Sequence, residues 1–101
     1  MNPPTGPEYD VPISGAVRDL LVRLHDEAAA DGRRTEFLTA LKSISRRLRT
    51  DPAGFGEELF DLRALHLTIN VAVVYPLVVE FGIYEDRRLV FIRTFRYVTP
   101  A

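Results

Sequence analysis

The sequence contains no cysteine, no tryptophan and only two histidines among its 101 residues. The absence of cysteine excludes disulfides, thiol catalysis and thiolate metal sites, and it agrees with a reducing compartment. Neither His25 nor His66 has a partner histidine at ligand spacing, so we expect no metal and no other cofactor. A strand-to-helix phosphate loop and a Gly-x-Ser-x-Gly motif are also missing, which removes the usual signatures of nucleotide-binding proteins and serine hydrolases.

Long apolar runs and an excess of one charge are missing as well. No stretch approaches the roughly 20 apolar residues that span a bilayer, and the start of the chain does not resemble a signal peptide. We therefore predict a cytoplasmic protein without membrane contact. A formal net charge of −1 lacks the positive field of a general nucleic-acid binder. The proline-rich residues 1 to 8 predict a flexible lead-in, and residues 9 to 101 predict a single domain.

Two amphipathic helices are predicted in the first half of the chain. Ser14 is a suitable N-cap, and apolar residues recur at helical spacing over residues 14 to 31, until Gly32. A second helix is predicted over residues 35 to 49, where Asp51-Pro52 stops it. Because only a few residues join the two helices, we expect a helical hairpin.

Strands are predicted in the second half, where the apolar period changes to two. They cover residues 65 to 74, 77 to 84 and 88 to 98, and a short polar connection at 85 to 87 favours an antiparallel hairpin. Residues 9 to 13 contain Pro12 and predict at most a short edge strand. Residues 53 to 58 predict a glycine-containing loop, followed by a short amphipathic stretch. The predicted fold class is α+β, with a helical hairpin packed on an antiparallel sheet of three to four strands.

The last predicted strand is apolar on both of its faces, although one helix layer covers only one face of a sheet. Strict alternation places Phe91 and Tyr97 on one side and Val90 and Ile92 on the other. We therefore predict that the face without helices is an interface, filled by a second copy in isolation and by a partner in the cell. The candidate interface residues are Val90, Phe91, Ile92, Phe95 and Tyr97. The predicted core includes Leu20, Leu24, Leu41, Ile44, Val79 and Phe91.

The order of these elements resembles the RelE/ParE superfamily of bacterial toxins from type II toxin-antitoxin systems. Residues 47 to 57 are similar to that family's end of the second helix and its following loop. Residues 77 to 92 are similar to its strand, acidic turn and Val/Ile-rich last strand. The resemblance implies a RelE/ParE-like fold and a cognate antitoxin as partner, whose helix or extended segment would cover the apolar second face.

Members of this superfamily that cut mRNA on the ribosome use basic side chains and a tyrosine on the sheet. The resemblance implies four candidate catalytic residues here, namely Arg63, Arg93, Arg96 and Tyr97. Leu77 and Val78 stand where the family carries a Tyr-Arg pair, and strand parity places Arg93 and Tyr97 on one face but Arg96 on the other. We therefore predict a protein that acts by protein binding without nuclease activity. The alternatives are a ribosome-dependent endoribonuclease and a non-enzymatic homodimer or larger oligomer.

A basic patch is predicted on the second helix. Lys42, Arg46 and Arg49 follow one another at helical spacing, with Arg47 beside them. Such a patch can bind the phosphates of RNA. Cations are also favoured in the last turn of any helix by its dipole, so we expect a purely structural role, with phosphate binding as the alternative.

Overall fold

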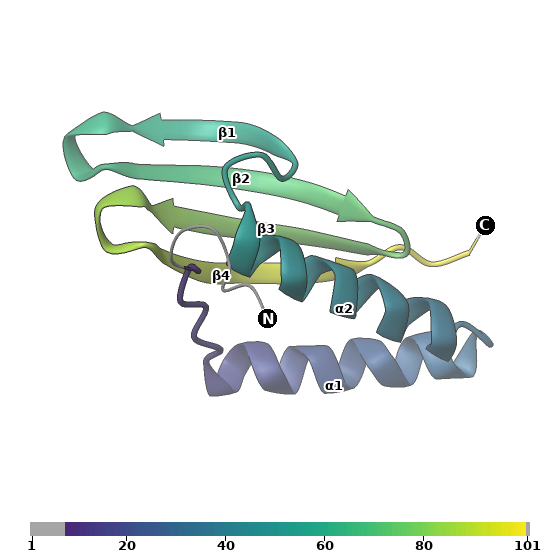
Figure 1. Ribbon diagram of the computed structural model, residues 1–101. Coiled ribbons are helices and arrows are strands. Elements are labelled where there is room, and N and C mark those ends of the chain that lie inside the picture. The colour runs from purple at the N-terminus through teal and green to yellow at the C-terminus, as the bar shows by residue number, and fades with distance from the viewer. Residues whose placement is uncertain (1–7, 101) are drawn as a thin grey trace, which may run out of the picture.

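The computed structural model describes residues 8 to 100, which form two helices followed by a four-stranded antiparallel sheet (Figure 1). The predicted α+β fold class is confirmed. The helices are α1 (Gly15–Ala30) and α2 (Arg34–Thr50). The strands are β1 (Glu57–Leu62), β2 (Leu67–Val74), β3 (Leu77–Tyr84) and β4 (Leu89–Tyr97), and they lie in this order across the sheet. The predicted lead-in at residues 1 to 8 lies outside the described residues, apart from Glu8.

The helix ends follow the signals in the sequence. Ser14 caps α1, because its Oγ accepts a hydrogen bond from the Val17 amide at 3.1 Å. Gly32 follows α1 with a φ of 75°, a left-handed conformation that glycine adopts without strain. Helix α2 begins at Arg34 and ends at Thr50, directly before Asp51-Pro52. The predicted helical hairpin is therefore present, with its boundaries shifted by one residue.

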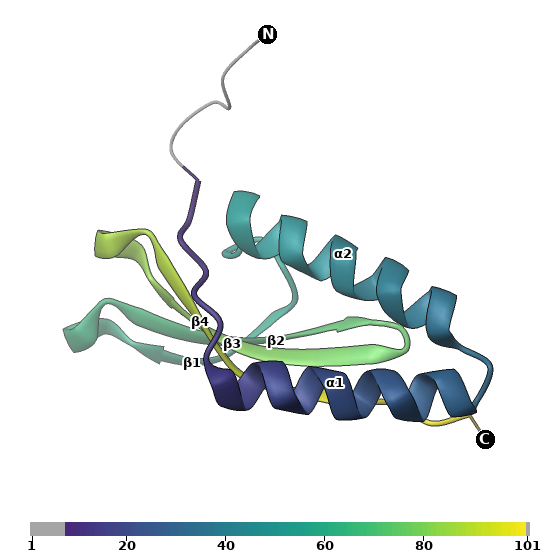
Figure 2. The same cartoon turned by 90° about the horizontal axis from the view of Figure 1, so that it is seen from below.

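Both helices pack on the same side of the sheet, where α1 contacts β4 and α2 contacts β3 and β2 (Figure 2). The helices lie close together at their connection and separate toward Gly15 and Thr50, and the segment before α1 runs between the separated ends. The predicted core residues Leu24, Ile44 and Val79 are buried, and Leu20 and Leu41 are half-buried against them. The buried core residues are Val17, Leu24, Ala28, Phe37, Ala40, Ile44, Leu48, Phe55, Ala72, Leu77, Val79, Phe81, Ile83, Val90 and Phe95.

One edge of the sheet is partly covered by the segment before α1. Asp10 forms a parallel bridge with Leu89 of β4: its amide donates to the Arg88 carbonyl, and its carbonyl accepts from the Val90 amide, both at 2.9 Å. Tyr9 donates its amide to the Arg49 carbonyl at 2.8 Å, which ties the same segment to the end of α2. The predicted edge strand over residues 9 to 13 is thus reduced to one bridge.

A β-bulge in β4 corrects the predicted alternation of that strand. Glu80 of β3 pairs with Thr94, but the next residue, Phe81, pairs with Ile92, so Arg93 is an extra residue. Because of this extra residue, the side chains on one side of the bulge point to the sheet face opposite to the one that strict alternation predicts. Val90, Ile92, Phe95 and Tyr97 therefore all point toward the helices, while Leu89 and Phe91 point away. The prediction of Phe91 in the helix-covered core was wrong for this reason.

Strand β1 occupies residues predicted as a loop and a short amphipathic stretch. It pairs with β2 from Glu57 opposite Val71 to Leu62 opposite Leu67, with a bulge at Leu59. A 3-10 turn, η1 (Arg63–Leu65), and His66 in the left-handed conformation connect it to β2. The first long strand consequently starts at Leu67 rather than at residue 65.

Candidate protein-binding surface

The surface of the sheet that faces away from the helices is covered by no described element, and we call it the far face. The strand register assigns its residues. They are Glu57, Phe60 and Leu62 of β1, Leu67, Ile69, Val71 and Val73 of β2, Val78, Glu80, Gly82 and Tyr84 of β3, and Leu89, Phe91, Thr94 and Arg96 of β4. In β2 the far face carries four aliphatic residues, whereas the helix side carries Thr68 and Asn70. The more apolar side of β2 is thus the side without helices.

The centre of the far face is a small apolar cluster of its own. Phe91 lies over Gly82, where a Cβ atom would collide with the Phe91 ring and lie 3.1 Å from the Ile69 side chain. The Tyr84 ring flanks Phe91 with a centroid separation of 5.7 Å. Leu67 and Ile69 are buried by such neighbours although no helix reaches them. The far face is therefore a preformed apolar surface.

The edge of the sheet at β1 is open, and all six residues of the strand are exposed (Figure 1). No strand among residues 8 to 100 pairs with its outer side. Phe60 is 58% exposed, and Leu59 and Leu62 are exposed beside it. An apolar edge strand is a ready template for pairing with another chain, and native proteins usually protect such edges with charged side chains, proline, a bulge or a covering element. Strand β1 has three carboxylates and a bulge at Leu59, but it carries no lysine or proline, and no element among residues 8 to 100 pairs with it from outside.

The charges of this edge are mainly negative. Glu57, Glu58 and Asp61 lie in β1, and Asp61 is paired with Arg63 of the following turn at 3.0 Å. Glu85 and Asp86 lie in the neighbouring turn η2 (Glu85–Arg87). A partner segment that pairs with β1 therefore meets an apolar strip flanked by carboxylates, which favours an apolar and basic sequence in the partner.

The structure places the predicted interface residues differently from the prediction. Val90 and Phe95 are buried in the core between the sheet and the helices, and Ile92 and Tyr97 are half-buried against the same core. The β4 bulge is the physical reason, because it turns both halves of the apolar strand toward the helices. Only Phe91 lies on the far face. The prediction that Val90 and Phe95 belong to an exposed interface is therefore wrong, and the uncovered apolar surface consists of the far face and the open edge of β1.

The four candidate catalytic residues do not come together. Arg63 follows β1 and is paired with Asp61, and Arg93 is paired with Glu80 at 2.7 Å. Arg96 lies on the far face, opposite Val78, whereas Tyr97 lies on the helix side. Arg63 and Tyr97 are also at opposite ends of the sheet, separated by the length of an eight-residue strand, roughly 25 Å. The predicted sharing of one face by Arg93 and Tyr97 was wrong because of the bulge.

Tyr97 belongs to a group of polar contacts at the helix connection. Its hydroxyl donates to Asp31 Oδ2 at 2.8 Å, and nearby Arg33 donates to the Tyr75 hydroxyl at 2.7 Å. Partial burial, and after it the hydrogen bond to Asp31, raise the pKa of Tyr97 from 10.0 to about 12. A tyrosine with a raised pKa keeps its proton at neutral pH, so Tyr97 acts here as a hydrogen-bond donor that ties β4 to the end of α1.

This pKa predicts a stability loss at high pH. Because the folded-state pKa of about 12 lies above the ordinary value of 10.0, the stabilisation is fully present below about pH 10 and is lost as the pH rises toward 12. Urea unfolding from pH 8 to 11.5 should therefore show a steeper decline in the parent than in Tyr97→Phe. Identical pH slopes in the two proteins would contradict the contact with Asp31.

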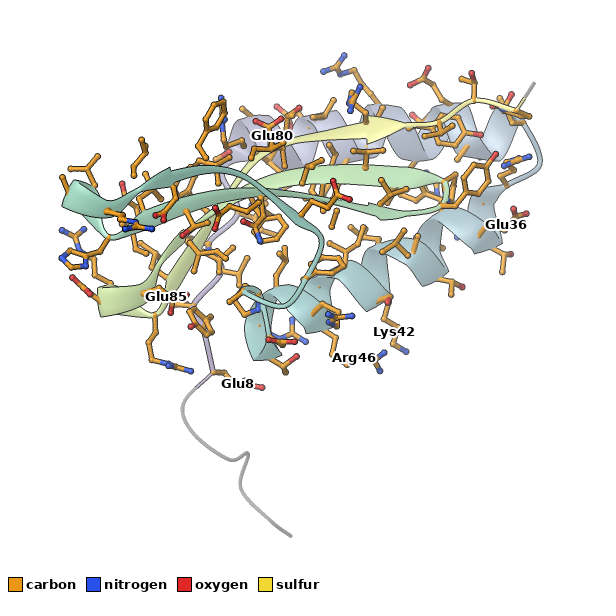
Figure 3. The ribbon with its side chains drawn as sticks, turned by 90° about the horizontal axis from the view of Figure 1, so that it is seen from above. Glu8, Glu36, Lys42, Arg46, Glu80 and Glu85 are labelled. Atoms are coloured by element: carbon orange, nitrogen blue, oxygen red, sulfur yellow. The ribbon has the colours of Figure 1, made fainter. Side chains whose placement is uncertain are left out.

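The predicted basic patch separates into two parts. Lys42 and Arg46 are exposed and point away from the sheet on the outer side of α2 (Figure 3). Arg47 turns to the following loop, where it donates to the Gly54 carbonyl at 3.1 Å and lies 4.9 Å from the centre of the Phe55 ring. Arg49 borders a cavity of about 430 Å³ between the helices and the segment before α1. Lys42 and Arg46 thus remain a pair on the outer side of α2, whereas Arg47 contacts the following loop and the exposed Arg49 lies at the rim of this cavity.

Comparisons with family models, curated proteins and solved structures return no match for this chain. Within residues 8 to 100, no group of three or more histidine, aspartate or glutamate side chains is arranged to hold a metal ion. None of the described helices has the length and apolar character needed to cross a membrane. Apolar side chains are exposed along the open edge of β1 and on the far face, at Leu59, Phe60, Leu62 and Val73.

Proposed function

We propose that this chain is a cytoplasmic RelE/ParE-like protein of a bacterial toxin-antitoxin pair and that it acts by binding other proteins. Its partner is a cognate antitoxin, which adds an extended segment to the open edge of β1 and covers part of the far face. The observation that carries this proposal is the exposure of Leu59, Phe60 and Leu62 on an edge strand without a pairing partner among residues 8 to 100.

An added strand forms two kinds of favourable contact with the edge of β1. The outward amide and carbonyl groups of β1 gain hydrogen bonds with the added strand, which supplies affinity without requiring a particular sequence. Alternate side chains of the added strand then lie on the far face beside Phe60 and Leu62, where they bury apolar surface. The two contributions act together, because the edge and the far face meet along β1.

The charge of the edge supports a basic partner rather than a second copy of the chain. If two β1 strands paired antiparallel about their centre, Glu58 of one copy would face Asp61 of the other, and Glu57 would face Leu62 near Arg63. Like charges on adjacent strands are unfavourable. A basic, apolar segment meets the same carboxylates with opposite charge. The homodimer expected from the sequence stays a prediction. Repulsion between these carboxylates disfavours a dimer that pairs through β1.

Co-expression with the product of each directly adjacent gene tests the proposal. We expect one of the two products to co-purify in stoichiometric amounts with the tagged chain. We also expect expression of the chain alone to slow bacterial growth, and expression with that product to restore it. If neither product binds, or if the purified chain is a stable dimer that Phe60→Lys dissociates, the proposed partner is wrong.

The proposal also predicts that the purified protein does not cleave translated mRNA. Arg63, Arg93 and Tyr97 are held in separate pairs with Asp61, Glu80 and Asp31, and Arg96 lies on the sheet face opposite to Tyr97, so the four residues do not converge on one phosphate. Primer extension on mRNA in a reconstituted translation system measures cleavage. Cleavage that disappears in both Arg93→Ala and Tyr97→Phe would establish the endoribonuclease alternative instead.

A further inference from the structure

A polar cavity of about 230 Å³ adjoins β1 on the helix side of the sheet. It lies between the loop after α2, which contributes Gly56, and the strand residues Glu58, Thr68 and Asn70, and Glu85 closes it from the turn after β3. Because Glu58 pairs with Asn70 across β1 and β2, the cavity begins at the open edge and extends one strand inward. It is therefore within reach of a side chain on a strand added to β1.

Asn70 is the buried polar residue of this cavity. Its side chain lies on the core side of β2, and the residue is only 3% exposed. The amide Nδ2 donates to the Phe55 carbonyl at 3.3 Å, which fixes the orientation of the amide because the carbonyl can only accept. The other atom, Oδ1, contacts no donor among residues 8 to 100. A buried acceptor without a donor is unfavourable, so this position calls for a ligand that donates a hydrogen bond.

The other polar residues of the lining have the same preference, whereas Ala53 and Ile83 add apolar contacts. Glu58 and Glu85 supply carboxylate oxygens, and Thr68 supplies a hydroxyl. Glu85 Oε2 already accepts from the Tyr9 hydroxyl at 2.9 Å, which holds that carboxylate toward the segment before α1. No lysine or arginine is among the lining residues. The polar part of the lining therefore consists of acceptors and negative charge, and a cation with several donors is its complement.

The number and the spread of the acceptors favour a guanidinium group over an ammonium group. A guanidinium presents five N–H donors in a planar fork, whereas an ammonium is a compact point charge that is more strongly hydrated. A volume of about 230 Å³ also exceeds the space that one ammonium group fills. The acceptors stand on three strands or turns, at Glu58, Asn70 and Glu85, so a forked donor can contact more than one of them.

We propose that this cavity binds the guanidinium of an arginine side chain from the protein partner. The source of the arginine rests on the proposed function, whereas the chemistry of the cavity does not. Asn70 Oδ1 has less than 1 Å² of accessible surface, so a neighbouring side chain turns aside when the donor enters. Glu58 is exposed and pairs with Asn70 across β1 and β2, so we infer that its side chain is the one that moves.

Titration of the isotope-labelled protein with N-acetyl-arginine amide tests the cavity without any partner. We expect saturable NMR shifts of the Asn70 side-chain amide and of the Gly56 and Glu58 backbone amides, with a Kd on the order of 1 to 10 mM. N-acetyl-citrulline amide has the same shape without the charge, and it should bind at least about fivefold more weakly; the corresponding lysine derivative should do the same.

Matched variants connect the shifts to the cavity. Asn70→Leu should lose the arginine shifts and keep a urea midpoint close to that of the parent, because it removes the unpartnered acceptor Oδ1 together with the hydrogen bond from Nδ2 to the Phe55 carbonyl. Glu58→Gln should weaken arginine binding, whereas Glu27→Gln on α1 should not change it. Equal binding of arginine and citrulline, equal binding of arginine and lysine, or no saturable shift in this cavity overturns the proposal. Such a failure leaves strand addition at β1 intact, because that is tested with Phe60 variants.

Discussion

Replacing Gly56 with alanine should lower the free energy of unfolding by about 3 to 4 kcal/mol. Gly56 has a φ of 80°, in the left-handed region where an L-residue is strained, by ~1 to 2 kcal/mol. The added Cβ would also collide with the backbone carbonyl of Val71, so the start of β1 would have to move away from β2. Urea unfolding followed by circular dichroism measures the loss.

Gly32 is a matched control for this prediction. Its φ of 75° carries the same backbone strain, but a Cβ at this position meets nothing within 4 Å. Gly32→Ala should therefore cost only about 1 kcal/mol, the lower end of the left-handed penalty. Equal losses in the two variants would mean that the close approach of the loop to β2 contributes nothing to stability.

Replacing Phe60 with lysine should weaken binding of the partner by about 30-fold or more, which corresponds to about 2 kcal/mol. The change removes the largest exposed apolar side chain of β1 and places a positive charge where a basic segment is expected to bind. Lysine on an edge strand also opposes pairing with another strand. Because Phe60 is 58% exposed, the folded protein should tolerate the change. Calorimetric titration of the purified adjacent-gene product measures the affinity.

Val73→Lys is the matched control on the same sheet face. Val73 is 66% exposed and equally apolar, but β1 pairs with β2 only as far as Val71, so Val73 lies beyond the end of β1. We expect this variant to bind within about threefold of the parent, because it leaves the edge intact. If Val73→Lys weakens binding as much as Phe60→Lys, the partner uses the apolar face in general and does not add a strand at β1.

The helical half of the fold was predictable because its signals are local. The N-cap at Ser14, the stop at Asp51-Pro52 and the apolar period of both helices each depend on a few neighbouring residues. The hairpin from β3 to β4 was predictable for the same reason, since a short polar connection joins two strands of period two. The prediction of these elements was enough to give the correct arrangement of a helical layer on an antiparallel sheet.

Strand β1 could not be recognised from its own residues. The run Glu57-Glu58-Leu59-Phe60-Asp61-Leu62 has no clear alternation, because the bulge at Leu59 inserts a residue that pairs with nothing in β2. Two nearby glycines also indicate a loop. Strand β1 forms because its backbone pairs with β2, which is a non-local contact. The open edge that now carries the proposed function was therefore missed, and exposed apolar residues next to acidic ones were its only signal.

The bulge in β4 is the reason why most of the predicted interface residues face the helices. The sequence correctly indicates a strand with apolar residues at nearly every position, but one extra residue at Arg93 converts two apolar faces into one. Asn70 was not recognised as a site residue, because an asparagine in an alternating strand is normally expected on the solvent side. The apolar neighbours at the same parity, Ala72 and Val74, were the signal that Asn70 faces the core.

Hydrogen-deuterium exchange of the free protein and of its complex with the partner tests strand addition most directly. The backbone amides of β1 that point away from β2 have no strand partner among residues 8 to 100, so they should exchange fast in the free protein. In the complex, strand addition predicts strong protection of these amides, together with weaker protection across the far face. Protection confined to the cavity between the helices and the segment before α1, with β1 still exchanging fast, would contradict the proposed mode of binding.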